Sequence, residues 1–302
     1  MKDAARDQGA RAALLGVAAN LVLSAAKAGA GILGGSQALI ADAVNSLGDV
    51  LGSCLVWLGI RWGAMPPDDD HPYGHGRAET VAVACVGLLL TLAALQIGRM
   101  GLGALVRPTE AIPAPYTGLV AAGTALVKEL LYRYKRRLGE RLGSPALIAN
   151  AHDHRSDALA AALVLASIGA SQLSVLLGVP WLARMDAAGA VIVCAFILKT
   201  AYSLLRQALA EVMDKQVSGE ELEAYRSLVG SVQGVSAVDD LRVRTYGRYR
   251  VVDVKIAVSP QISVAEGHDI AARVKERILQ ERAGDTAGVM VHVNPHRGED
   301  RP

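Results

Sequence analysis

Long apolar runs dominate the first 210 residues of the chain, and a pattern typical of soluble domains replaces them after Asp214. A bilayer core of about 30 Å requires roughly 20 mostly apolar helical residues. Six runs fit this requirement: 12–33, 37–62, 79–103, 113–134, 145–173 and 182–209. The sequence therefore predicts six transmembrane helices.

The first and fourth runs each contain a lysine at a position that needs an explanation. Lys128 and Glu129 lie in the fourth run, near one end, where we expect their long side chains to reach the lipid headgroups. Lys27 in the first run either extends to the headgroups in the same way or neutralises one acid of the candidate membrane site described below.

Residues 213–297 show shorter periodic segments. The pattern predicts helices at 219–233 and 263–282 and strands at 236–246, 249–258 and 287–294. The order αββαβ indicates a small α+β domain of the ferredoxin-like, metallochaperone-like type. We therefore expect an α-helical polytopic transmembrane domain over 1–212 and a cytoplasmic αββαβ regulatory and dimerisation domain over 213–297, which we call the tail. A short terminal segment over 298–302 follows it.

The composition supports a membrane protein. Of the 302 residues, 52% are hydrophobic and 20% are charged, whereas soluble domains have about 45–50% apolar and about 25% charged residues. The net charge of +2, with 13 basic and 13 acidic residues over 215–302, argues against a nucleic-acid partner. No HExxH or GxSxG motif occurs, so a membrane-embedded hydrolase is disfavoured, and we expect no enzyme activity and no catalytic cofactor.

The distribution of basic residues predicts the orientation. Lys and Arg in short loops favour the cytoplasm. Three groups of them fall on one side of the six runs: Lys2, Arg6 and Arg11; Arg61 and Arg77; and Arg133, Lys135, Arg136, Arg137 and Arg141. The other side has few. Both termini are therefore expected in the cytoplasm.

An internal repeat places polar residues in two of the apolar runs. Residues 39–49 align without gaps with residues 147–157, at an offset of 108. Within each copy two oxygen-bearing side chains stand four residues apart and so share one helix face. These pairs are Asn45 with Asp49 and Asp153 with Asp157. Asp42 and Asn150 lie one turn earlier on the same faces, and the three residues of each copy together form what we call a polar stripe.

A carboxylate at membrane depth is costly unless it is paired, hydrated or bound to a cation. If the second and fifth runs pack together, Asn45, Asp49, Asp153 and Asp157 offer four oxygen ligands to one divalent cation. Without the cation, the same acids are expected to bind protons, which compete with a metal ion. The alternative is a set of hydrogen bonds that only join the helices.

The motifs resemble those of the cation diffusion facilitator family over nearly the whole chain. They are Asn45-Ser-Leu-Gly-Asp49, the loop from Asp68 to Glu79, His154-Arg-Ser-Asp157 and the αββαβ tail. The resemblance implies a homodimer in the plasma (inner) membrane that exports divalent metal from the cytoplasm by alternating access in exchange for protons. It also implies that Asn45, Asp49, Asp153 and Asp157 form the transport site.

Two departures from the zinc pattern of that family bear on the metal. Asn45 stands where zinc-type members have Asp, and Asp153 stands where they have His. An all-oxygen ligand set suits Mn²⁺, whereas imidazole suits Zn²⁺, and the combination resembles the manganese-exporting branch. Fe²⁺, Co²⁺ and Zn²⁺ remain alternatives, because raw affinity generally rises from Mn²⁺ towards the later metals. A helix rotation that brings in His152 or His154 would restore a zinc-like site.

The resemblance implies further sites outside the membrane. Asp68, His71 and His75 match a peripheral metal site, although solvated histidines beside a turn would give the same pattern. Asp239, His268 and His292 match tail positions that bind metal between protomers. Lys255 and Asn294 replace ligands of zinc members, which leaves one weaker site or only surface histidines. Arg77 and Asp214 match a charge pair that either acts as a pivot or consists of ordinary surface charges.

We therefore expect a Mn²⁺/H⁺ antiporter that contributes to metal homeostasis. The rivals are a Zn²⁺, Fe²⁺ or Co²⁺ exporter of the same family, a passive channel, and a membrane-anchored dimeric scaffold or metal sensor that transports nothing. Loss of transport when the membrane acids are replaced would exclude the scaffold, and saturable flux coupled to protons would exclude the channel.

Overall fold

The structure, a computed structural model, describes residues 2–63, 65–106, 112–142 and 145–296. Side chains are described throughout these ranges except at 2–14, 53, 56–57, 60, 142, 145–146 and 149. The predicted terminal segment 298–302 and the side chains of Lys2, Arg6 and Arg11 therefore lie outside the described part.

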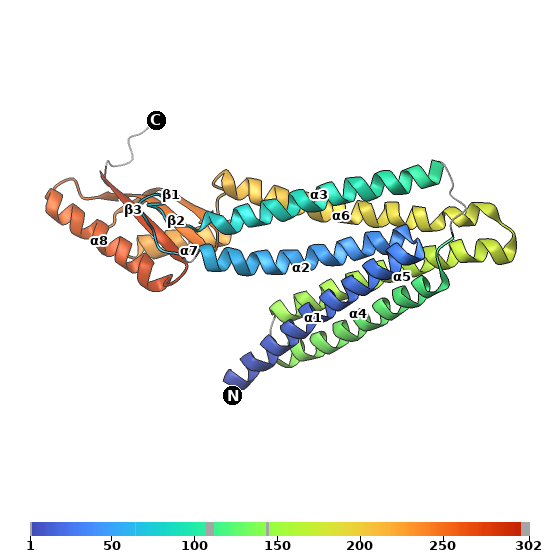
Figure 1. The fold of residues 1–302 in the computed structure, drawn as a ribbon. Coiled ribbons are helices and arrows are strands. Elements are labelled where there is room, and N and C mark those ends of the chain that lie inside the picture. The colour runs from blue at the N-terminus through green and yellow to red at the C-terminus, as the bar shows by residue number, and fades with distance from the viewer. Residues whose placement is uncertain (1, 64, 107–111, 143–144, 297–302) are drawn as a thin grey trace. The chain divides into compact units, whose positions relative to one another are not determined.

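Six long helices account for residues 2–212. Their bounds are α1(Lys2–Gly34), α2(Gln37–Gly63), α3(Arg77–Val106), α4(Pro115–Leu142), α5(Pro145–Leu177) and α6(Met185–Val212), with a short 3₁₀ helix, η1(Pro180–Arg184), before α6. Figure 1 labels the six helices and colours them from blue to yellow along the chain. The six helices appear where the apolar runs predict them.

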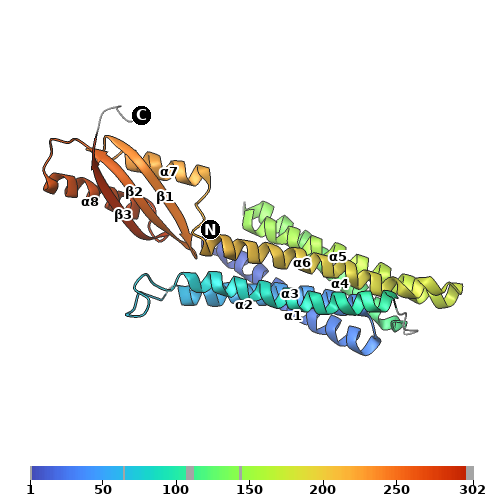
Figure 2. The ribbon, with the colours of Figure 1, turned by 90° about the horizontal axis from the view of Figure 1, so that it is seen from above.

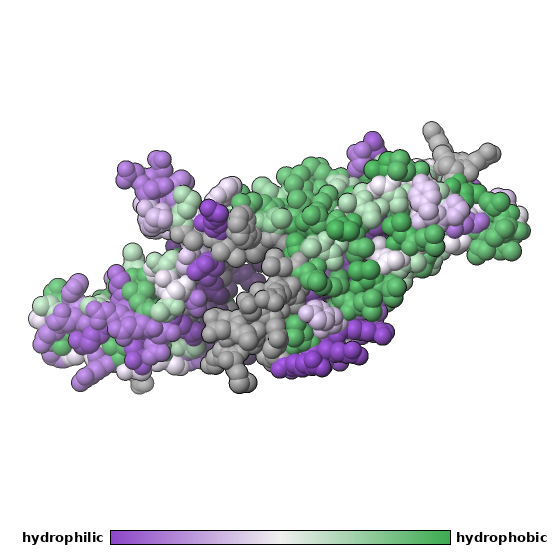
Figure 3. Space-filling view, turned by 60° about the horizontal axis from the view of Figure 1, so that its bottom comes forward, coloured by the Kyte–Doolittle hydropathy of each residue, from purple (hydrophilic) through white to green (hydrophobic). Residues whose placement is uncertain are grey.

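Four of these helices are long and apolar enough to cross a membrane over their described residues: the segments 15–34, 77–106, 150–177 and 180–212. Their outer surfaces are apolar. For example, Leu88, Leu89, Leu92 and Leu95 of α3 are each more than half exposed, and Figure 3 shows hydrophobic side chains over much of the long helices. Since monomeric soluble proteins rarely expose large contiguous apolar patches, this is an integral membrane domain. Six crossings remain a prediction, because α2 and α4 are not among the four segments that meet this requirement over the described residues.

The described chain divides into two compact units, Met1–Cys54 with Cys85–Leu205 and Leu55–Ala84 with Arg206–Pro302. The first unit holds α1, α4 and α5 in direct contact, with α4 packed along α5. The second unit joins the segment around residues 65–77 to the tail. These compact units are not the two predicted domains, so the predicted domain boundary between residues 212 and 213 stays a prediction.

Asp186, in the first turn of α6, holds the start of α2 within the first unit. It is 5% exposed and accepts hydrogen bonds from Ser36 Oγ at 2.7 Å and from the Gln37 backbone amide at 2.6 Å. The first amides of a helix have no partner inside the helix and carry partial positive charge, so a carboxylate stabilises them. Asp186 thereby fixes where the polar stripe of α2 begins.

The tail has the predicted order αββαβ. Its elements are α7(Gly219–Gly230), β1(Ala237–Tyr246), β2(Tyr249–Val258), α8(Val264–Glu281) and β3(Thr286–Pro295). In the sheet β2 is central, antiparallel to β1 and parallel to β3. Figure 2 shows the three strands with α7 and α8 beside them.

Alternation along the strands builds the core of the tail. Side chains at every second position, including Val243 of β1, Val252 of β2 and Val291 of β3, face Tyr225 of α7 and Val274 of α8. One face of the sheet therefore receives both helices. A capping box begins α8, in which Ser263 and Glu266 each bond the backbone amide of the other.

The core assignment predicts unequal effects of the same substitution at two valines. Val243 is 0% exposed and Val264 is 93% exposed. We expect Val243→Ala to cost about 2 kcal/mol, so amides of β1 to β3 should exchange hydrogen roughly 30-fold faster. Hydrogen exchange with mass spectrometry on the full-length protein measures this. Val264→Ala is the matched control, and equal effects of the two variants would contradict the core assignment.

Candidate metal sites

The polar stripes of α2 and α5 lie in the same compact unit. Asn45 and Asp49 of α2 are half-buried, Asp157 of α5 is half-buried, and Asp153 is exposed. The Asp49 carboxyl lies within electrostatic reach of both Asp157 and Asp153. Electrostatic interactions weaken with distance, so the two stripes face a common region rather than opposite surfaces.

The three membrane acids are nevertheless not gathered around one point in this conformation. Across the described residues, the only group of three or more His, Cys, Asp or Glu whose ligand atoms all lie within 4.8 Å of one another is in the loop before α3. One reason is that Asp157 is engaged elsewhere: its Oδ2 accepts a short hydrogen bond from Lys128 Nζ of α4.

Lys128 corrects one expectation from the sequence. Its side chain is 0% exposed, so it does not reach the headgroups. Glu129, in contrast, pairs with Arg133 one helical turn away, at 2.7 Å, on the exposed side of α4. The apolar run shows that Lys128 lies in a helix, but its partner is 29 residues away on α5 and could not be read from the run.

Two further lysines are buried against the stripes. Lys27 of α1 is 1% exposed and bonds Asp42 at 3.0 Å and Ser46 Oγ at 2.6 Å. Lys27 therefore does not extend to the headgroups, and its partner Asp42 lies on the same face of α2 as Asn45 and Asp49 without being one of the four predicted transport-site residues. Lys135, expected in a cytoplasmic connection, is instead 1% exposed within α4 and bonds Asn150 Oδ1 at 2.6 Å.

The two histidines beside Asp153 lie against residues of α4. His154 is 3% exposed, and its Nε2 lies 2.8 Å from Lys135 Nζ. His152 is exposed and its ring lies 5.9 Å from that of Tyr132. In this conformation neither imidazole joins the oxygen-bearing stripe.

The loop before α3 brings Asp68, His71 and His75 together, as the sequence predicts. Asp68 Oδ1 lies 3.1 Å from His71 Nδ1 and Asp68 Oδ2 lies 3.3 Å from His75 Nε2, while the two rings are 4.4 Å apart. The hydrogen bond from the His71 backbone amide keeps the pKa of Asp68 below its usual range. One carboxylate and two imidazoles can hold a divalent cation such as Zn²⁺ or Mn²⁺.

The three tail residues Asp239, His268 and His292 are not brought together. His292 Nε2 lies 3.0 Å from Asn294 Oδ1, and Asn294 in turn donates to Asp239 at 2.7 Å. His268 is exposed on α8. Because Val291 and Val293 of β3 face the helices, His292 points to the opposite side of the sheet. A shared site within one chain is therefore not formed here.

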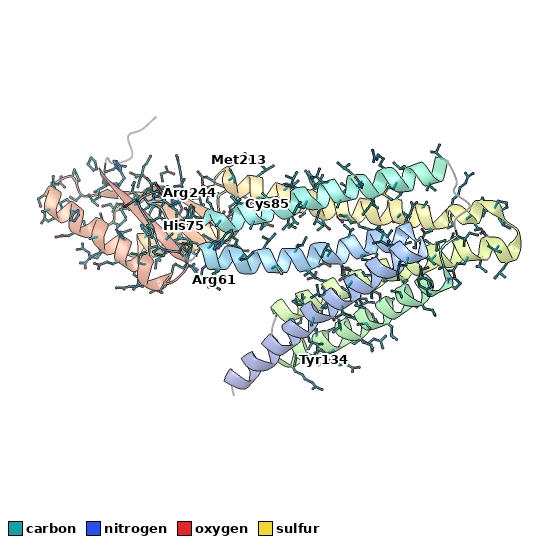
Figure 4. All side chains as sticks on the ribbon, in the orientation of Figure 1. Arg61, His75, Cys85, Tyr134, Met213 and Arg244 are labelled. Carbon is teal, nitrogen blue, oxygen red and sulfur yellow. The ribbon has the colours of Figure 1, made fainter. Side chains whose placement is uncertain are left out.

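Arg77 and Asp214 form an ion pair of 2.5 Å in the second unit, and Arg244 joins Asp214 at 2.9 Å. Partial desolvation would raise the pKa of Asp214, but the hydrogen bonds and charges of the two arginines outweigh it, so the pKa is lowered. Figure 4 shows His75 and Arg244 in the same region of this unit.

A second contact ties the loop to the β1–β2 hairpin. Tyr246 Oη donates to the Gly74 carbonyl at 2.7 Å, next to His75, and the Arg77 guanidinium lies over the Tyr246 ring. Gly247 has φ of +58° and lies so close that a Cβ there would meet the Gly76 oxygen at 2.2 Å. The predicted strands 236–246 and 249–258 leave a short connection here, but the contact with the loop depends on tertiary structure and is not evident from the sequence.

Comparison with known proteins covers almost the whole chain. Residues 13–213 match the family model described as cation efflux transmembrane domain, and residues 217–296 match that of the cation efflux protein cytoplasmic domain. The manganese efflux system protein MneP of Bacillus subtilis is 35% identical over 292 residues, covering 95% of this chain and 96% of that protein. MneS of the same organism is 33% identical over 288 residues, with the same coverage.

The magnetosome protein MamB of Magnetospirillum gryphiswaldense is 31% identical over 251 residues, covering 83% of this chain and 82% of that protein. A solved structure titled MamM-CTD 215-293 matches with 22% identity and a TM-score of 0.25, covering 26% of this chain and all of that one.

The charge cluster around Asp214 predicts a pH-dependent effect. Since the pKa of Asp214 is lowered from 3.8 on folding, its stabilising contribution is present above that value and is lost as the pH falls through the lower folded value. Asp214→Asn should therefore increase hydrogen exchange at 74–77 and 244–247 at neutral pH. The difference from wild type should diminish as the pH falls below 3.8 towards the lower folded value.

The measurement is hydrogen exchange corrected for the intrinsic rate at each pH. Asp269→Asn, at an exposed position of α8, is the matched control. A difference that persists unchanged over the same fall in pH would show that the Asp214 charge is not its cause.

Proposed function

This chain belongs to the cation efflux, or cation diffusion facilitator, family, and we propose that this divalent metal efflux transporter carries Mn²⁺ out of the cytoplasm in exchange for protons. The observation that carries the proposal is the doubled polar stripe, whose acids Asp49, Asp153 and Asp157 lie in one compact unit and act on one another electrostatically.

We propose Asn45, Asp49, Asp153 and Asp157 as the transport site. All four offer oxygen, and hard oxygen ligands suit Mn²⁺ better than imidazole does. The positions of His152 and His154 support this choice, because the His152 ring lies tilted near that of Tyr132 and His154 lies beside the Lys135 ammonium. The names of MneP and MneS, which describe manganese efflux, agree with it.

Proton exchange follows from the chemistry of the same ligands. Carboxylates must be deprotonated to bind a metal, so metal binding releases protons and proton binding releases metal. Asp49, Asp153 and Asp157 would therefore hold Mn²⁺ on the cytoplasmic side and protons on the return step. Asn45 would contribute its carbonyl oxygen without adding charge. Because a ligand shifts only an equilibrium whose states bind it differently, the inward- and outward-facing states must differ in the access or geometry of this site.

The remaining sites have supporting roles in the proposal. Asp68, His71 and His75 would bind a second cation at the cytoplasmic face. The contact of Tyr246 with Gly74 would link that loop to the tail. The ion pair of Arg77 with Asp214 would hold the N-terminal end of α3 in place while the protein changes between its inward- and outward-facing states. We place the protein in the plasma (inner) membrane as a homodimer with both termini in the cytoplasm.

Loss of one membrane acid should remove transport. In proteoliposomes we expect Asp49→Ala to lower Mn²⁺ flux by about 10- to 100-fold or more, since losing even an outer partner of a metal ligand costs that much. Wild-type flux should increase with an opposing proton gradient. Asp269→Ala is the control. Flux indifferent to the pH gradient would refute antiport, and full transport by Asp49→Ala would refute the site.

An imidazole in the site should change metal preference. We expect Asp153→His to raise the ratio of Zn²⁺ to Mn²⁺ transport on the order of tenfold, because imidazole favours the later metal. Asp153→Asn, which keeps an oxygen donor, controls for loss of the carboxylate. Uptake of Mn²⁺, Fe²⁺, Co²⁺ and Zn²⁺ is compared across the three proteins. An unchanged ratio in Asp153→His would show that residue 153 does not set the preference.

A further inference from the structure

Lys128 is a fully buried cation in direct contact with a residue of the transport site. It is 0% exposed, and its ammonium donates to Asp157 Oδ2. Removing an ammonium from water costs several kcal/mol unless a partner compensates it. Asp157 supplies that compensation, so each group neutralises the other in this conformation.

The internal repeat extends beyond the acidic stripes to the buried lysines. Lys27 on α1 and Lys135 on α4 differ by the same 108 residues, and so do their partners. The repeat-related contacts are Lys27 with Asp42 and Ser46, and Lys135 with Asn150 and His154. In both halves the lysine therefore bonds the polar stripe on the following helix.

Lys128 breaks this symmetry. The residue 108 positions earlier is Asn20 of α1, a neutral amide, and the repeat partner of Asp157 is Asp49. The Asn20 carbonyl oxygen is buried without a hydrogen-bond partner in the described part of the chain. A positive side chain is thus present at this repeat position only in the half that contains Asp157.

We propose that Lys128 is a resident cation of the transport site, which holds Asp157 when metal is absent and must release it when Mn²⁺ binds. The inference rests on the proposed function. Asp49, Asp153 and Asp157 bring three negative charges, and Mn²⁺ with the Lys128 ammonium brings three positive ones. The loaded site is then neutral, which limits the cost of carrying it at membrane depth.

Competition for Asp157 has two kinetic consequences. A fixed positive charge beside the site lowers the affinity for a cation, and its return to Asp157 assists release of the metal. Lys128 therefore keeps binding weak enough for turnover. Without it, Mn²⁺ should bind more tightly and leave more slowly.

Two variants test this in opposite directions. For Lys128→Gln we expect the KM for Mn²⁺ to fall about tenfold or more while the maximal rate also falls, because the competing charge is gone. For Lys128→Arg we expect the KM to rise, because a guanidinium can grip the Asp157 carboxylate with two hydrogen bonds. Initial rates of Mn²⁺ flux in proteoliposomes measure both. Lys199→Gln, which removes an exposed lysine of α6, controls for net charge.

The outcomes separate this inference from the proposed function. If wild type does not transport Mn²⁺, the function itself fails. If wild type transports Mn²⁺ and Lys128→Gln has an unchanged KM or only a reduced maximal rate, Lys128 is a structural ion pair and the inference is overturned. Should Lys128→Gln fail to fold, as judged by thermal unfolding, Lys128→Arg decides: an unchanged or lower KM overturns the inference.

Discussion

The cost of placing charge at membrane depth governs the arrangement of the first compact unit. Lys27, Lys128 and Lys135 are each at most 1% exposed, and each bonds a polar residue of the stripe on a neighbouring helix. Since an unpaired ion in hydrocarbon is costly, these contacts determine which faces of α1 and α4 meet α2 and α5. The same constraint would favour a divalent cation at the proposed transport site, because the buried lysines do not supply enough positive charge to neutralise all of the acids of the two stripes.

The charges of the second compact unit are arranged differently, since water competes for them. Arg77, Asp214 and Arg244 are partly exposed, and such pairs contribute little energy individually. Their value is geometric. Together with the Tyr246 hydroxyl and the close approach of Gly247 to Gly76, they hold the loop of His75 against the hairpin of the tail. An ion bound at Asp68, His71 and His75 would rigidify a segment that the tail already contacts.

Much of this organisation is predictable from sequence because it is local or periodic. Apolar runs predict the six helices, alternation predicts the tail strands, and the gapless repeat predicts that Asp49 and Asp157 occupy equivalent positions. The failures concern tertiary partners. Lys128 was expected at the headgroups and Lys135 in a loop, because a run of residues does not reveal a partner on another helix. Within one chain the tail residues Asp239, His268 and His292 do not form a cluster, because strand alternation puts His292 on the sheet face opposite the helices while His268 is exposed on α8. A metal site between two protomers stays a prediction.

The most direct measurement is the position of Lys128 and of the two stripes when metal is bound. Cryo-electron microscopy of the full-length protein in lipid nanodiscs, with and without Mn²⁺, resolves both. We predict one ion between Asp49 and Asp157 with the Lys128 ammonium withdrawn from Asp157. The account would be contradicted if Mn²⁺ were seen only at the loop of Asp68, with Lys128 still bonded to Asp157 and the two stripes too far apart to share an ion.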